Sequence, residues 1–409
     1  MISFWSRHFI LPLGVHRLLQ SLLTRFLWKG DTSSIGGAKV AWKDVCLPIE
    51  EGGLGLPNPL DWNRAQIMYY VWLIINKDES SLWSRWVLST VLKNKPFWII
   101  TTPFDCSWIW RQILALRDEV LSHISYDIGR GDSISLWFDP WCHSSTLATG
   151  LSDPIIGYSY SNPGARVSDI IVEGSWCLPQ PNPNQRRPSE RFERWRQDFH
   201  YPSVNSGRND KLLWEGRACP LVNVRWIWDS IRRRTAVTPW WKAVWFKHGI
   251  PRFRTHSWLL CLGRLGTLDR LDNWNITDTT LCYLCVGGVE SHNHLFLHCP
   301  YASFTLGHLL HSITTITIPP SWAWTDLLLG LFALENPTRR LLALLAVQIF
   351  AYHIWRERNA RRHGKGVFGP RLLLHGIITD LRARVLTEPW FTTAMTYDPQ
   401  LISCITYFE

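Results

Sequence analysis

The feature that most constrains this chain is a short segment in which cysteine and histidine residues crowd together. The segment LCYLCVGGVESHNHLFLHCP, residues 281–300, carries two cysteines separated by two residues, then a Gly-Gly pair, and then a second group of metal-binding residue types. Cysteines at this spacing can bind one ion through both sulfur atoms, and the glycine turn lets a second pair of ligands return to it. The pattern therefore predicts a fold organised around a metal ion.

Spacing selects four donors for one ion: Cys282, Cys285, His294 and Cys299. Zinc accepts such sulfur and nitrogen ligands in a tetrahedron. His292 and His298 compete with His294, but His298 adjoins Cys299, and adjacent residues rarely direct two donors at one metal. Four protein ligands leave no open position for water, so we predict one structural zinc ion that stabilises folding. The competing interpretation is a group of buried thiols that bind no metal.

The other seven of the ten cysteines are scattered singly along the chain. This distribution is typical of a reducing compartment, so we expect an intracellular protein, with the nucleus slightly favoured over the cytoplasm. Pro12 and polar residues interrupt the apolar run at the N-terminus, which predicts no secretion. The apolar segment 341–355 contains Gln348 and His353 and is short for a bilayer, so we expect a buried helix and no membrane partner.

Hydrophobic spacing predicts a mainly α fold with small β elements, an α+β class. Helices are expected in five regions: 11–28, 61–95, 107–122, 223–274 and from about 323 to the end. A β-hairpin is expected over 125–141, because Gly129 and Gly131 allow a tight turn before a stretch in which alternate residues are apolar.

The predicted order is a helical N-terminal segment with the hairpin, a flexible middle, a small zinc-binding subdomain and a helical C-terminal tail. The corresponding boundaries are 1–142, 143–210, 211–320 and 321–409. The middle region is rich in Ser, Pro, Asn and Gly, as in CLPQPNPNQRRPSE (177–190). Such a composition buries too little apolar surface to fold alone, so a linker is expected.

Basic residues exceed acidic ones by 43 to 33, which gives a formal net charge of +10, and the chain carries 26 tryptophans. The surplus favours a polyanionic partner, although solvated helix faces would produce the same surplus. Most of the large rings should belong to the core. A few lie beside Arg or Lys, as in 225–234 and 240–249, where they can serve as base-stacking platforms.

Several stretches together resemble the region that follows the reverse transcriptase core in plant non-LTR (LINE-type) retrotransposon proteins, which ends in the reverse-transcriptase zinc-binding domain. The resemblance covers nearly the whole chain, and it is carried by 26–30, 39–58, 81–87, 128–141, 244–271 and 290–296. It implies a post-polymerase connection region over 1–142 and the zinc-binding domain over 211–320. In the family pattern, Glu-Ser precedes by two residues the histidine that leads into Leu-Phe, which also selects His294.

The resemblance implies a module that helps a polymerase hold RNA or DNA during target-primed reverse transcription. The chain departs from a complete polymerase, because it contains no adjacent Asp-Asp pair. Two-metal nucleotidyl transfer requires clustered carboxylates. No endonuclease or ribonuclease H pattern is evident either. We therefore expect a non-enzymatic, zinc-binding and nucleic-acid-binding fragment of a LINE-type reverse transcriptase protein.

Two alternatives stay open: a protein-interaction scaffold for a separate polymerase core, and a decayed retroelement remnant without selected function. If RNA or DNA is the partner, the expected contacts are basic residues just before the zinc segment: Lys242, Lys247, Arg252, Arg254, Arg264 and Arg270. Each of them has the ordinary alternative of being a surface or helix-capping cation. The oligomeric state is not predicted.

Overall fold

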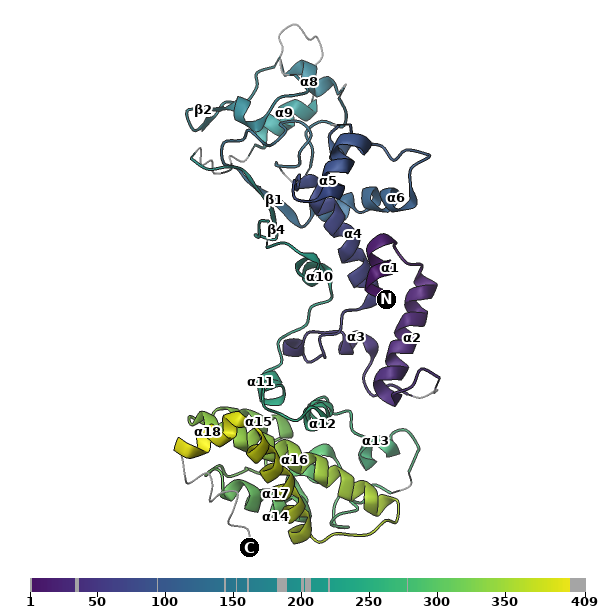
Figure 1. Cartoon of the computed structure of the whole chain (residues 1–409), viewed down its shortest axis with the longest axis vertical. Coiled ribbons are helices and arrows are strands. Elements are labelled where there is room, and N and C mark those ends of the chain that lie inside the picture. The colour runs from purple at the N-terminus through teal and green to yellow at the C-terminus, as the bar shows by residue number, and fades with distance from the viewer. Residues whose placement is uncertain are drawn as a thin grey trace. The chain divides into compact units, whose positions relative to one another are not determined.

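The computed structural model describes residues 2–33, 37–93, 95–142, 145–151, 153–159, 162–181, 190–199, 202, 207–219, 221–277 and 279–397. The chain divides into two compact units (Figure 1): unit 1 is Met1–Leu22 with Pro57–Arg233, and unit 2 is Leu23–Leu56 with Arg234–Glu409. Helices predominate in both, and the described strands form two small two-stranded sheets. The predicted mainly α fold with small β elements is confirmed. The division into four domains stays a prediction.

The helical elements of unit 1 alternate with short loops. They are α1 (Ile2–His8), α2 (Leu13–Lys29, whose last residues belong to unit 2), α4 (Pro59–Ile75), α5 (Leu82–Trp86), η2 (Val87–Val91), η3 (Phe97–Ile99), α6 (Trp108–Ala115), α7 (Arg117–Leu121), α8 (Pro154–Tyr158), η4 (Val167–Ile170), α9 (Glu190–Gln197) and α10 (Val224–Ile231). The helix expected over 61–95 is interrupted, because Lys77 adopts a left-handed conformation with φ of 50° directly after α4.

Helix α4 is the centre of unit 1. The Asn58 side chain caps its first turn by accepting a hydrogen bond from the Leu60 amide at 3.1 Å. Inside the helix, the buried Asn63 side chain accepts a hydrogen bond from the Leu11 amide at 2.8 Å and donates to the Ser6 carbonyl at 2.6 Å. These bonds satisfy the amide within an apolar core and fasten the N-terminal chain to α4.

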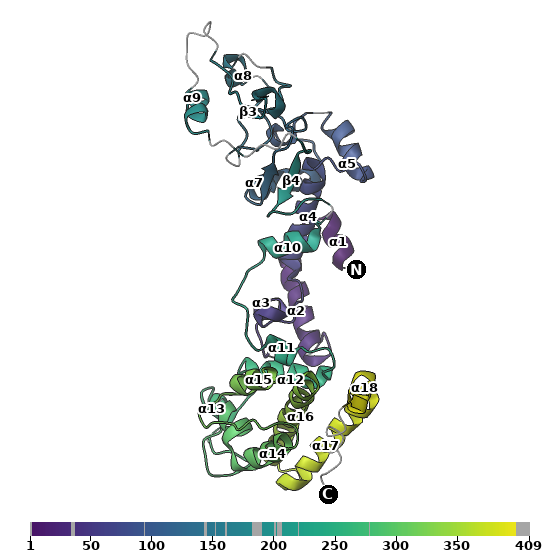
Figure 2. The same cartoon turned by 90° about the vertical axis from the view of Figure 1, so that its left-hand side faces the viewer.

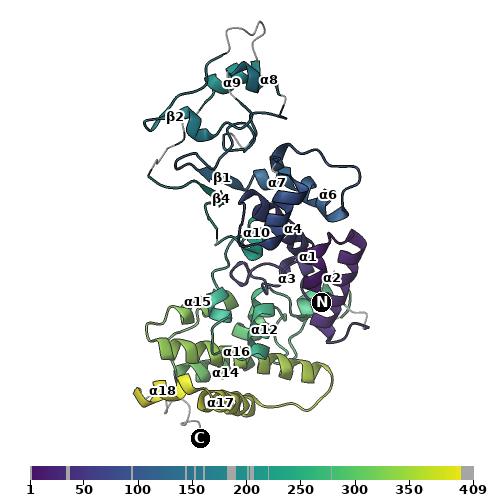
Figure 3. The same cartoon turned by 45° about the horizontal axis from the view of Figure 1, so that its top comes forward.

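The hairpin predicted over 125–141 is wrong. Strand β1 (Ile124–Asp127) pairs antiparallel with β4 (Lys211–Trp214), and the two lie side by side in Figure 3. The loop after β1 is held by the Asp210 carboxylate, which accepts hydrogen bonds from the amides of Gly129, Gly131 and Ser133 at 2.8, 2.8 and 3.0 Å. The amides of the expected hairpin turn thus donate to a carboxylate that is distant in the sequence. The two glycines therefore belong to a loop that Asp210 stabilises, and not to a hairpin turn.

The middle segment 143–210 differs from the expected linker in its described parts. It carries α8, η4, α9 and a small sheet of β2 (Ile171–Val172) and β3 (Ser175–Trp176). Its aromatic side chains pack against tryptophans that precede it; the ring centroids of Trp137 and Trp195, for example, lie 6.3 Å apart. These preceding rings supply the apolar surface that the segment lacks by itself.

Unit 2 is helical apart from its metal-binding loop. Its elements are α3 (Trp42–Val45), η1 (Ile49–Glu51), α11 (Trp241–Val244), α12 (Pro251–Cys261), α13 (Leu268–Asp272), η5 (His294–His298), α14 (Pro300–His311), α15 (Trp324–Phe332), α16 (Pro337–Arg362), α17 (Pro370–Thr387) and α18 (Pro389–Tyr397). Figure 2 shows α16 beside α14 and α17, and α16 also contacts α12 and α15.

Helix α16 contains the apolar segment 341–355, whose buried side chains form the centre of the unit 2 core. The Gln348 side chain is buried there and donates a hydrogen bond to the Val244 carbonyl at 3.0 Å. The predicted buried helix is thus observed. Across the described residues, no helix combines the length and the apolar character needed to cross a membrane.

Candidate metal centre

The four predicted zinc ligands converge in unit 2: one ligand atom from each of Cys282, Cys285, His294 and Cys299 lies within 4.8 Å of the others. Cys285 Sγ is 3.4 Å from His294 Nε2, and Cys282 Sγ is 3.9 Å from Cys299 Sγ. In a tetrahedral zinc site the bond lengths place neighbouring ligand atoms roughly 3.3 to 3.8 Å apart. The donors are therefore already spaced to surround one such ion.

The first ligand pair lies on a tight turn that the backbone stabilises. The Leu284 amide points at Cys282 Sγ over 3.4 Å, and the Cys282 amide donates to the Gly288 carbonyl at 2.8 Å. Gly288 also faces the histidine ligand. A Cβ atom at this position would lie 2.8 Å from His294 Cε1, so a larger residue would displace the ring.

The second ligand pair is positioned by one wide helical turn. In η5 the Cys299 amide donates to the His294 carbonyl at 2.6 Å, a bond that spans five residues and closes a π-helical turn. Cys299 then caps α14, where Pro300 occupies the first helical position. The turn brings residues 294 and 299 to the same side, which a regular α-helix, with about 3.6 residues per turn, would not do.

The sulfur of Cys282 is prepared for metal binding before any ion arrives. The pKa of its thiol is lowered, because the Cys299 side chain and the amides of Cys285 and Leu284 lie beside the sulfur and stabilise the thiolate. The thiolate is the form of cysteine that binds zinc. Both Cys282 and Cys299 are buried, while Cys285 and His294 are half-buried.

A buried ion pair behind the ligands escaped the sequence interpretation. Glu290 is fully buried and pairs with Arg358 of α16, with Arg358 Nη2 at 2.5 Å and Nε at 3.1 Å from the carboxylate oxygens. The same carboxylate accepts a hydrogen bond from the Leu268 amide at 3.0 Å. Both partners have their polar atoms satisfied, which offsets the cost of burying the two charges.

A second arginine of α16 reaches the cysteine turn itself. Arg361 donates to the Leu284 carbonyl at 3.1 Å and to the Glu357 carboxylate at 2.8 Å. Two arginines of the basic stretch 354–363 therefore form their hydrogen bonds within unit 2. No local pattern marks this role, because the contacts join segments that are far apart in the sequence.

The two competing histidines lie away from the ligand group. His292 is half-buried, with its Nδ1 3.4 Å from the Thr267 hydroxyl, and burial lowers the pKa of its ring. His298 is exposed. The structure thus brings His294, rather than either neighbour, beside the three cysteines.

The six basic residues expected to contact nucleic acid differ in exposure. Four are exposed: Lys242, Lys247, Arg252 and Arg264. Arg252 lies over the rings of Phe253 and Tyr352, at 5.0 and 4.9 Å from their centroids, and Lys242 lies 5.4 Å from the Trp241 centroid. These cations remain open to solvent while their stems cover aromatic surface.

The other two, Arg254 and Arg270, are half-buried. Arg254 donates to the Phe246 carbonyl at 3.2 Å, and Arg270 lies over the Trp274 ring at 5.0 Å. Burial lowers the pKa of both guanidinium groups. These two side chains are engaged in packing within unit 2.

Residues 223–305 match a protein family described as zinc-binding in reverse transcriptase, and the match includes all four ligands. The chain is also similar to the Arabidopsis thaliana protein named "Putative ribonuclease H protein", with 22% identity over 307 residues. That alignment covers 71% of this chain and 47% of the relative, so the chain spans about half the length of the curated relative it matches. The donor geometry and the family match agree on a site for one zinc ion.

Proposed function

We propose that this chain, whose residues 223–305 match the family described as zinc-binding in reverse transcriptase, is a non-enzymatic, zinc-stabilised fragment of a LINE-type retrotransposon protein that binds RNA or DNA. The observation that supports nucleic-acid binding most directly is the set of exposed cations between α11 and α13. Arg252 and Lys242 combine a charge open to solvent with an adjacent aromatic ring. Sites for single-stranded nucleic acid combine cations for the phosphates with aromatic rings for the bases.

Zinc has a structural role in this proposal. Its four donors are sulfur and nitrogen atoms, which close the tetrahedron and leave no position for a reacting water. Within the described ranges, this is the one group of clustered metal-binding side chains, and it includes no carboxylate. Nucleotidyl transfer and two-metal nuclease chemistry both use clustered carboxylates. The donor set therefore supports a binding role rather than catalysis by these residues.

The proposal is tested with the full chain by measuring bound zinc and titrating single-stranded RNA and DNA across a salt series. We expect about one zinc per chain, which a Cys282→Ser, Cys285→Ser variant loses. Log affinity should fall linearly with log salt, by roughly 0.7 for each phosphate contacted. A chain that binds zinc but neither nucleic acid would instead support the scaffold or remnant alternatives.

Two matched substitutions test the contact residues. Lys247→Gln and Arg252→Gln should each reduce the salt slope by roughly 0.7, since each removes one phosphate contact. Lys365→Gln changes another exposed lysine of unit 2 and should leave the slope unchanged. If Lys247→Gln and Lys365→Gln reduce the salt slope equally, the affinity depends on the net charge of the chain and not on a defined contact surface.

A further inference from the structure

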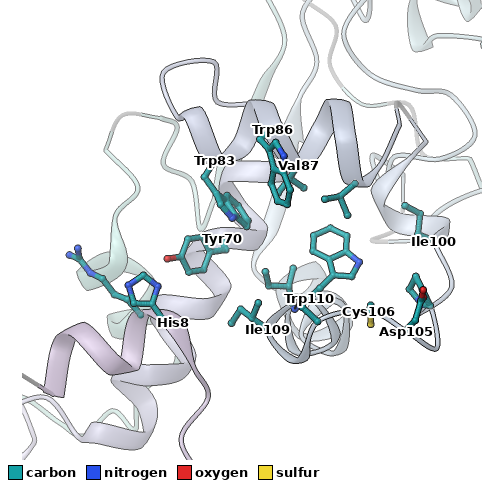
Figure 4. Close-up of a pocket in the computed structure, with 15 residues that line it drawn as sticks. His8, Tyr70, Trp83, Trp86, Val87, Ile100, Asp105, Cys106, Ile109 and Trp110 are labelled. Atoms are coloured by element: carbon teal, nitrogen blue, oxygen red, sulfur yellow. Dashed lines mark hydrogen bonds between the residues drawn. The ribbon is translucent and has the colours of Figure 1, made fainter.

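Unit 1 contains a cavity of about 630 Å³ that plays no part in the zinc site (Figure 4). It is bordered by side chains from α1, α4, α5, η2 and α6. Four of these side chains are aromatic: Tyr70, Trp83, Trp86 and Trp110. Figure 4 shows the rings of Tyr70, Trp83 and Trp86 on one side and that of Trp110 across the cavity. Its size is within the range of sites for small organic ligands.

The four rings differ in what they do for the fold. Trp110 is buried, and Tyr70 packs against Trp83 with ring centroids 4.6 Å apart, so these three belong to the unit 1 core. Trp86, by contrast, is 55% exposed and lines the same cavity. Leaving so much of an indole in water forgoes the stabilisation that its burial would bring. An exposed ring at the mouth of a pocket is therefore available to a ligand.

Four polar side chains, Arg7, His8, Asp105 and Ser107, also line the cavity. Figure 4 shows His8 near Tyr70 and Asp105 beyond Trp110. Two of the helices that form the walls also carry exposed cations, Arg85 on α5 and Arg111 on α6. Arg7 in the lining, with Arg85 and Arg111 on the wall helices, outnumbers the one lining carboxylate, Asp105, and this balance favours an anionic ligand.

We propose that this cavity binds an unpaired base of single-stranded nucleic acid, with the base stacked on Trp86 and the adjoining phosphate facing Arg7. The proposal rests on the nucleic-acid binding proposed above but concerns a second contact, in unit 1. A nucleotide with an unpaired base offers flat faces for the rings, a polar edge for Ser107 and a negative charge for Arg7. An apolar side chain of a protein partner would contact the rings and leave Arg7 without a counter-charge.

The test compares full-length variants in their binding of oligothymidylate and of an abasic strand of equal length, at one salt concentration. Trp86→Ala should weaken oligothymidylate binding about 5- to 150-fold, equivalent to 1–3 kcal/mol for one stacked base, and should leave binding of the abasic strand unchanged. Trp86→Phe, which keeps a ring, should recover most of the loss. The control is Trp108→Ala: Trp108 is 45% exposed at the start of α6 and does not line the cavity.

The outcomes separate this proposal from the one it rests on. If oligothymidylate binds with a normal salt slope and Trp86→Ala has no effect, the base pocket is overturned while nucleic-acid binding by unit 2 stands. If Trp86→Ala weakens binding but Lys247→Gln and Arg252→Gln do not, the pocket stands and the unit 2 contacts are overturned. If neither strand binds, both proposals fail. Loss of self-association in Trp86→Ala with unchanged strand binding would make the pocket a protein contact and would also overturn the proposal.

Discussion

In unit 1 the buried core collects Trp72, Trp214 and Trp228 around α4, whereas in unit 2 leucine-rich α16 packs beside a zinc site and a buried ion pair. The edge of one unit 1 tryptophan meets the face of another: the Trp72 and Trp214 centroids lie 6.1 Å apart at 79°. Unit 1 is thus held by the burial of large apolar surfaces. Unit 2 adds directional interactions that demand particular atoms at particular places.

The two units are therefore sensitive to different kinds of substitution. Apolar packing tolerates a change of shape in proportion to the surface and volume that are lost. A metal site or a buried ion pair fails as a whole when one partner is removed, because the remaining partner is left buried without compensation. Substitutions that remove a similar number of atoms should therefore lower the stability of the two units by different amounts.

Removal of zinc should produce the largest effect. Chelation, or the Cys282→Ser variant, should unfold the region around the ligands, because the binding energy of structural zinc, on the order of 10 kcal/mol, is largely folding energy. Hydrogen exchange followed by mass spectrometry should show loss of protection in unit 2 and unchanged protection in unit 1. The control is Cys177→Ser, which alters an exposed free cysteine of unit 1. Equal loss of hydrogen-exchange protection in both units would contradict a stabilising role of zinc that is confined to unit 2.

Truncation of a core tryptophan should have the next largest effect, and in unit 1. Trp214 is fully buried, so Trp214→Ala should lower the free energy of unfolding by about 4 kcal/mol through lost apolar burial and the resulting cavity. Urea denaturation monitored through unit 1 amides measures this. Trp5→Ala removes a ring that is 50% exposed in the same unit and should cost much less. Similar losses for both would show that the unit 1 core is loosely packed.

The buried ion pair should follow. Glu290→Gln should destabilise unit 2 by about 3 kcal/mol, since Arg358 keeps its charge in an apolar surrounding without a counter-charge. The double variant Glu290→Leu, Arg358→Met should be less destabilised than either charge-breaking single variant. For comparison, Glu190→Gln breaks the exposed Arg194–Glu190 pair of unit 1 and should cause no measurable change. Additive losses in the double variant would argue against a coupled pair.

The smallest expected effect concerns pH and His256. This ring is buried among Phe296, Tyr352 and Trp355, and burial lowers its pKa to about 3. The unfolded chain therefore binds a proton more readily than the folded chain between pH 6.5 and about 3, and stability falls as the pH falls through that window. From pH 7 to pH 5 the loss should be about 2 kcal/mol.

The measurement is the urea unfolding free energy of unit 2 at pH 7 and pH 5, with bound zinc checked at both. His256→Phe removes the titrating group and should flatten this part of the profile. A variant that loses as much stability as the parent chain over the same interval would assign the pH dependence to other groups, including the metal ligands.

The sequence was sufficient to select the four candidate zinc ligands, because all four lie within one short stretch and their spacing makes convergence on an ion feasible. It also determined the helical character of most of the chain and the burial of the segment 341–355, since both follow from local periodicity and composition. Local patterns suffice where the interacting residues are close in sequence.

Pairs of residues that are far apart in the sequence could be identified only in the folded chain. Asp210 accepts hydrogen bonds from the amides of Gly129 and Gly131, the glycines on which the hairpin prediction rested. Arg358 pairs with the buried Glu290 instead of facing solvent. The tryptophans before residue 143 complete a core for a segment whose own composition predicted a linker. In each case the deciding energy comes from a group distant along the chain, and neither periodicity nor motif spacing carries that information.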